Sequence, residues 1–81
     1  MTARTLKPFR PIDAHNGIRV GDKARVNVAR QVYNGKLWRG WYVCTVRGIE
    51  RGGEWDRVVV HVETLNGTRF DHCDPEYVVA V

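Results

Sequence analysis

The chain has 81 residues, of which 43% are hydrophobic and 27% charged; this is the composition of one globular domain and excludes an intrinsically disordered chain. No apolar run approaches the roughly 18 residues of a membrane span, and no apolar segment follows the basic residues near the N-terminus, so we expect no secretory signal, no membrane partner and a cytoplasmic location. Two cysteines without CxxC spacing, Cys44 and Cys73, predict free thiols rather than a disulfide framework.

The formal net charge of +4 is unevenly distributed along the chain. Residues 1–47 hold ten Lys or Arg against two acids, a balance of +8, whereas residues 48–81 hold three against seven, a balance of −4. Such asymmetry between halves is typical of a protein with a polyanion-binding face. The alternative is that a compact fold mixes both halves in space and leaves no basic patch.

The chain begins with a segment that has no strand-like period. Residues 1–17 contain two prolines and three basic residues, which predicts an extended, weakly packed N-terminal arm. From residue 18 onward the hydrophobic period is two. A first strand near 23–32 alternates strictly at its start, with Val26 and Val28 facing inward.

We expect a long loop over residues 33–40, with Asn34 and Gly35 able to adopt positive φ. A tryptophan in such a polar loop, Trp38, has few ways to join the core and is expected to be an exposed contact residue. A second strand follows at 41–49, in which Gly48 is typical of a bulge or bend.

The second half of the chain continues with short strands and turns. Three further strands are expected at 57–65, 68–71 and 78–81. Asn66-Gly67 is a strong hairpin signal, and Asp74-Pro75-Glu76 predicts one turn of 3₁₀ helix before the last strand. The expected core consists of Val26, Val28, Cys44, Val46, Val58, Val60, Val62 and Val79.

Five short strands with so small a core are most stable in a sheet that curls and closes, because closure removes exposed edges. We therefore predict an all-β fold, a small five-stranded SH3-like barrel with a 3₁₀ turn before the last strand. The barrel spans residues 18–81 and the extended N-terminal arm spans residues 1–17.

Three segments carry a resemblance to SH3-like small barrels of the Tudor, Agenet and KOW type. Residues 21–26 resemble their first strand, residues 40–49 their second strand, and residues 66–78 their closing hairpin and 3₁₀ turn. The resemblance implies a binding module rather than an enzyme. Tudor-like domains hold methylated cations, and KOW-like domains bind RNA, DNA or protein. For a methylated cation, the matching positions are Trp38, Trp41, Tyr42 and Phe70, with Asp71 or Asp74 as the carboxylate.

The residues with the most functional promise interleave aromatic rings with cations, as suits stacking on bases and contact with phosphates. They are Tyr33, Lys36, Trp38, Arg39 and Trp41, continued by Lys23, Arg25 and Arg47 on the first two strands. The alternative interpretation is that Trp41 and Leu37 cap an open barrel end and that Lys36 and Arg39 are only solvated.

A metal centre or a catalytic site has little support in the sequence. His72 and Cys73 are adjacent, so strand geometry directs their side chains to opposite faces rather than onto one zinc ion. Neither Cys73 with His72 nor Cys44 with His61 has an orienting third residue or an oxyanion hole at a recognisable spacing. We therefore expect no cofactor and no enzyme activity.

Two functions remain open. The first is a nucleic-acid-binding module that contacts DNA or RNA through its basic and aromatic surface with weak sequence preference. The second is a protein-interaction module, such as a small adaptor or a phage-type protein that docks on a host protein, with exposed tryptophans as hot spots. The sequence does not distinguish oligomeric states.

Overall fold

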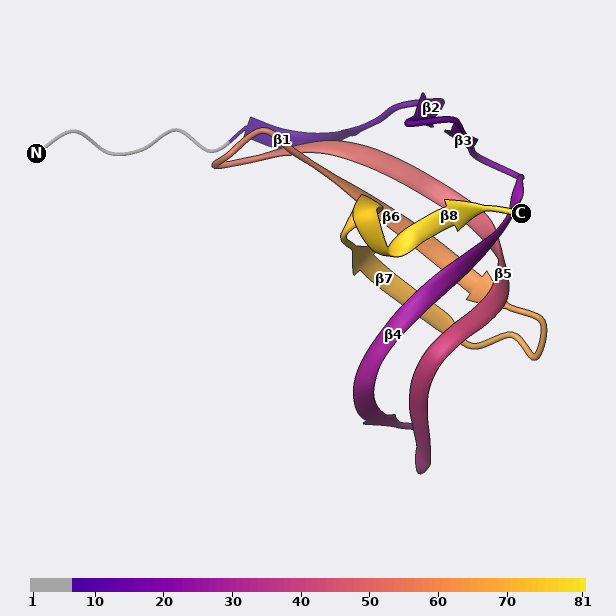
Figure 1. Cartoon of the computed structure of the whole chain (residues 1–81). Helices are drawn as coiled ribbons and strands as arrows, with labels where there is room; N and C mark the ends of the chain where they lie inside the picture. The colour runs from indigo at the N-terminus through magenta and orange to yellow at the C-terminus, as the bar shows by residue number, and fades with distance from the viewer. Residues whose placement is uncertain (1–6) are drawn as a thin grey trace, which may run out of the picture.

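The computed structural model describes residues 7–81, which form an all-β, antiparallel fold (Figure 1). Its strands are β1 (Lys7–Pro11), β2 (Ala14–His15), β3 (Ile18–Arg19), β4 (Lys23–Tyr33), β5 (Lys36–Gly53), β6 (Arg57–Thr64), β7 (Arg69–Cys73) and β8 (Val78–Ala80). The main sheet has the order β7-β6-β5-β4-β8, with β1 added on β5, and β2 and β3 form a separate two-stranded ladder. None of the described residues forms a helix long and apolar enough to cross a membrane.

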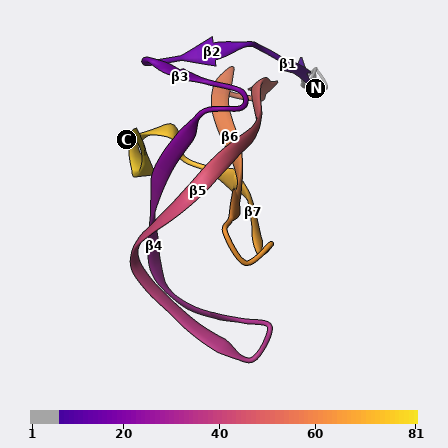
Figure 2. The same cartoon turned by 90° about the vertical axis from the view of Figure 1, so that its right-hand side faces the viewer.

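The strands β4 and β5 form one long hairpin that reaches beyond the rest of the sheet, away from β1 (Figures 1 and 2). Their pairing runs from Lys23 opposite Thr45 to Tyr33 opposite Lys36, with a register shift between Val28 and Gln31.

The prediction of a long loop over residues 33–40 is therefore wrong. Asn34 and Gly35 have φ of 52° and 71° and turn the chain in two residues, so residues 36–40 belong to β5. Positive φ at both central positions matches the twist of a hairpin.

The core lies on the inner face of the sheet, as the alternation of β4 and β6 predicts. Six of the eight expected core residues are buried, and Val58 is partly buried against them. The prediction that Val79 belongs to the core is wrong. Val79 pairs with Arg25 on the outer face, and Val78 takes the core position instead. The core cluster also contains Ile18, Ala24, Trp38, Ile49 and Phe70.

The expected turns are present. The register between β5 and β6 shifts between Val46 and Gly48, at the predicted bulge. The 3₁₀ turn η1 (Pro75–Tyr77) is capped by Asp74, whose side chain accepts a hydrogen bond from the Glu76 amide at 3.2 Å. This turn joins β7 to β8, the two ends of the strand order, and no ladder joins these strands within residues 7–81. The sheet is curled but is not a closed barrel.

The N-terminal arm is extended, but the prediction that it packs weakly is wrong for residues 7–12. Here β1 pairs with β5, and the Ile12 amide donates to the Ile49 carbonyl at 2.8 Å. Gly52 permits the close approach, because a Cβ there would lie 2.5 Å from the Pro8 carbonyl oxygen. An edge strand tolerates the prolines of β1. The remaining part of the predicted arm, residues 1–6, lies outside the described residues.

Candidate functional site

The β4–β5 hairpin is strongly cationic. We call residues 23–47 the basic ribbon. It carries six Lys or Arg and no Asp or Glu, because all nine acids of the chain lie before or after it. Its cations are Lys23, Arg25, Arg30, Lys36, Arg39 and Arg47, and all six are exposed. Pairing of β4 with β5 thus concentrates positive charge on two adjacent strands.

Most of this charge is not neutralised within the molecule. Arg47 binds Glu63 of β6, with 3.0 Å between Nη2 and Oε2. The other five cations make no ion pair with any residue in the described range 7–81. Lys36 instead lies over the Trp38 ring, with Nζ 4.3 Å from the ring centroid. The ribbon therefore offers cations that an external anion could bind without first breaking an ion pair.

One face of the ribbon gathers several of the predicted site residues. Ala24, Val26 and Val28 point into the core, so the alternating residues Lys23 and Arg25 point to the opposite, outer face. Trp41 is 52% exposed on this outer face, and Arg39 precedes it by two residues in β5. The structure thus brings Lys23, Arg25, Arg39 and Trp41 onto one surface.

The interpretation of Trp38 as an exposed contact residue is wrong. Its side chain is only 3% exposed and its indole Nε1 donates to the Tyr33 carbonyl at 3.3 Å. The ring packs edge-on against Tyr42 and Phe70, at centroid distances of 4.8 and 5.1 Å. Trp38 lies opposite Gln31 on the inner face of the hairpin, so the curl of the sheet folds it into the core.

Tyr33 and Lys36 form the last pair before the turn and lie on the same side of the ribbon as Trp38. The Tyr33 ring packs 5.8 Å from Phe70 and is partly exposed. Tyr33 therefore lies away from the outer face, whereas Lys36 also reaches the edge of β5, where it lines one hollow with Trp41.

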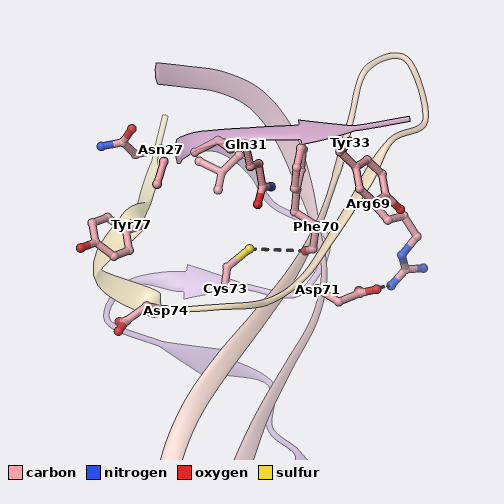
Figure 3. Close-up of a pocket in the computed structure, with 12 residues that line it drawn as sticks. Asn27, Gln31, Tyr33, Arg69, Phe70, Asp71, Cys73, Asp74 and Tyr77 are labelled. Atoms are coloured by element: carbon pink, nitrogen blue, oxygen red, sulfur yellow. Dashed lines mark hydrogen bonds and ion pairs between the residues drawn. The ribbon is translucent and has the colours of Figure 1, made fainter. Parts of the chain in front are cut away.

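A pocket of about 420 Å³ opens between β4 on one side and β7 with η1 on the other, where the sheet does not close (Figure 3). Its walls include Tyr33, Phe70 and Tyr77, with the amide side chains of Asn27 and Gln31.

Of the six positions matched to a methylated-cation cage, only Phe70, Asp71 and Asp74 line this pocket. Trp38, Trp41 and Tyr42 line a second hollow instead, together with Lys36, whose cation would repel a methylated ligand. Arg69 binds Asp71 at 3.2 Å and places a cation at the carboxylate that a methylated ligand would need. The structure does not assemble the expected cage.

A polar cluster ties β5, β6 and β7 together. The two ring nitrogens of His61 contact Glu50 Oε1 at 2.6 Å and Asp71 Oδ1 at 3.1 Å. Burial acts to raise the pKa of Asp71, but the hydrogen bond and charge of Arg69, helped by His61, outweigh it and hold the pKa below its ordinary value. Within residues 7–81, no group of three His, Cys, Asp or Glu side chains is arranged to hold a metal ion.

The two cysteines are free thiols with little nucleophilic character. Burial raises the pKa of Cys73 to about 11, with smaller contributions from Cys44 and Asp71, and burial also raises the pKa of Cys44. Because the thiolate is the reactive form, neither thiol is activated at neutral pH.

Sequence reasoning missed Arg30 and Val32 and considered Leu37 only as a cap of the barrel end, whereas the structure exposes all three near the end of the hairpin. The signal was present in Asn34-Gly35, a dipeptide typical of a two-residue hairpin turn. That turn pairs residue 33 with residue 36 and extends both strands through the supposed loop.

Fold and site together define an all-β domain with a projecting, cationic β-ribbon. Comparisons with protein-family models, with curated proteins and with solved structures find no match to this chain.

Proposed function

We propose that this protein is a non-enzymatic module that binds nucleic acid through the outer face of the basic ribbon, with weak sequence preference. The observation that carries the proposal is a ribbon with six exposed cations, no acid and, within residues 7–81, a single ion pair. Lys and Arg that neutralise phosphates release condensed counterions, and this release supplies most of the affinity of such proteins.

The outer face provides two kinds of contact. Lys23, Arg25 and Arg39 are suited to the phosphate backbone, whereas the exposed indole of Trp41 is suited to a base or a sugar. Arg47 contributes less, because Glu63 already compensates its charge.

We also propose that the domain is a partly open version of the SH3-like barrel. The strand order β7-β6-β5-β4-β8 and the 3₁₀ turn before the last strand support this relation to Tudor, Agenet and KOW domains. The open seam between β4 and β7 follows from the length of the ribbon, whose second half reaches past β8: only Ala24 to Val26 of β4 pair with that strand.

Fluorescence anisotropy with labelled duplex and single-stranded oligonucleotides tests the function. At about 50 mM salt the protein should bind, and Arg25→Gln with Arg39→Gln should weaken binding by about tenfold or more, since two phosphate contacts are lost. The matched control, Arg19→Gln with Arg57→Gln, removes the same charge from exposed positions outside the ribbon. Equal effects of the two double variants, or no binding at this salt concentration, would contradict the proposal.

A protein partner is the second candidate, and one observation favours it. Trp41, Val43 and Leu65 are exposed and line a shallow hollow of about 330 Å³ beside the ribbon. A buried tryptophan anchor is typical of protein interfaces. This candidate predicts no oligonucleotide binding and a captured protein partner that is lost with Trp41→Ala.

A further inference from the structure

The end of the basic ribbon exposes two apolar side chains that the fold does not use. Val32 is 73% exposed and Leu37 is 49% exposed. They are direct partners in the β4–β5 register, next to the Asn34-Gly35 turn. We call Val32 and Leu37 the tip pair.

The tip pair belongs to the same surface as the proposed phosphate contacts. Leu37 alternates with Trp38, whose side chain is in the core, so Leu37 shares the outer face with Arg39 and Trp41. Val32 faces the same way because it lies opposite Leu37. A nucleic acid seated on Lys23, Arg25 and Arg39 would therefore meet the tip pair next to the turn of the ribbon.

The dimensions suit a duplex. The eleven residues of β4 span about 35 Å when extended, close to the roughly 34 Å of one turn of B-DNA. Proteins that contact DNA with β-strands place them in either the major or the minor groove, and a minor groove that is widened by deformation of the duplex can admit such strands.

Apolar side chains gain little from phosphates or from the mostly polar base edges of a stacked duplex. The large apolar surfaces in DNA are the faces of the stacked bases, which are reached only when a base step opens. Proteins that insert Leu, Ile, Phe or similar wedges at such steps from the minor groove kink the duplex by about 20–90°.

We propose that the tip pair is a wedge that opens a base step of duplex DNA from the minor groove and bends the duplex around the ribbon. Cations on both sides of the wedge, Arg30 on β4 and Arg39 on β5, then hold the backbones of the bent DNA. This inference rests on the proposed function and specifies its ligand as double-stranded DNA that is deformed on binding.

Two properties follow. Binding should shorten the distance between the ends of a duplex. It should also be tighter, by about tenfold or more, on a duplex with a central mismatch or nick, since the unstacking cost is already reduced there.

The test measures energy transfer between dyes on the two ends of a duplex of about 25 base pairs, with anisotropy on the same DNA. Val32→Ala with Leu37→Ala should abolish the rise in transfer and the preference for mismatched DNA, while most of the phosphate-driven affinity remains. The matched control is Val20→Ala with Val81→Ala, which removes two exposed apolar side chains outside the ribbon and should leave bending intact.

The outcomes separate the two proposals. Three results would overturn the wedge and leave nucleic-acid binding in place. They are binding of duplex without bending, unchanged bending in Val32→Ala with Leu37→Ala, and binding restricted to single strands. A preference for thymine-rich duplex without bending would instead indicate contact with thymine methyl groups and would also overturn it. Absence of any nucleic-acid binding would remove the proposed function itself.

Discussion

Trp38 shows how one side chain changes the interpretation of a segment. It fills the core beneath the ribbon, so Trp38→Ala should cost about 3–5 kcal/mol of unfolding free energy, a large part of the stability of so small a domain. The control is Trp41→Ala, which removes an indole that is half exposed and should cost about 1 kcal/mol or less. Urea denaturation of the two variants measures both values. Similar losses for the two would contradict the assignment of Trp38 to the core.

Asp71 gives the molecule a defined dependence on pH. Burial works against its ionisation, but Arg69 and His61 lower its pKa in the folded state, so ionised Asp71 stabilises the fold. This contribution is present above the unfolded pKa of about 3.9 and is lost as the pH falls through the lower folded value. Because the carboxylate is half exposed, Asp71→Asn should cost only about 1 kcal/mol or less at pH 7.

Denaturant unfolding at several pH values checks the sign of this effect. The stability difference between the wild type and Asp71→Asn should be present at pH 7 and should vanish at the acid end. Asp13→Asn is the control, since the Asp13 side chain makes no ion pair in the described part of the chain. A difference that grows on acidification would refute the argument.

At the scale of elements, the sequence predicted the strands and turns that local residue patterns determine. Alternation identified the strands that contain Val26 and Val60, and Asp74-Pro75 identified the 3₁₀ turn. The local patterns did not identify β1, because β1 pairs with a part of β5 that lies some forty residues away along the chain. They also placed Trp38 outside, because only the three-dimensional curl of the hairpin turns that residue inward. The placement of a site on one face depends on such long-range geometry.

The docking of β1 on β5 can be tested at a glycine. A Cβ at Gly52 would lie 2.5 Å from the Pro8 oxygen and 2.7 Å from Phe9 Cα, both backbone atoms that cannot move alone. Gly52→Ala should therefore displace β1 and cost about 1–3 kcal/mol. Gly48→Ala is the matched control in the same strand, because its Cβ would meet His61 Cδ2 at an ordinary 3.5 Å.

Hydrogen exchange of the Ile12 amide reports on β1 directly, since this amide donates to Ile49. Its protection should fall in Gly52→Ala and should persist in Gly48→Ala. If the Ile12 amide stays protected in both variants, the pairing of β1 with β5 does not depend on the space that Gly52 leaves.

Across the whole molecule, charge is separated in space as well as in sequence. The second half of the basic ribbon projects from one end (Figure 1), whereas the acids Glu63, Asp71 and Asp74 are used within the fold: Glu63 and Asp71 bind arginines, and Asp74 caps η1. A polyanion approaching the ribbon therefore meets cations without an equal number of nearby carboxylates. The separation explains how a net charge of only +4 can accompany a strongly basic surface.

The salt dependence of binding measures how many of these cations act. If three or four of the unpaired cations neutralise phosphates, log K should fall against log salt with a slope of about −2.7 to −3.6 on duplex DNA. Removing one contact, as in Arg25→Gln, should reduce the magnitude of the slope by about 0.9. Arg57→Gln lowers the net charge equally from β6 and should leave the slope unchanged, because counterions are released only where phosphates are contacted. Anisotropy titrations from about 50 to 200 mM salt provide the slopes. Equal changes for the two variants would show that overall charge, and not the ribbon, governs binding.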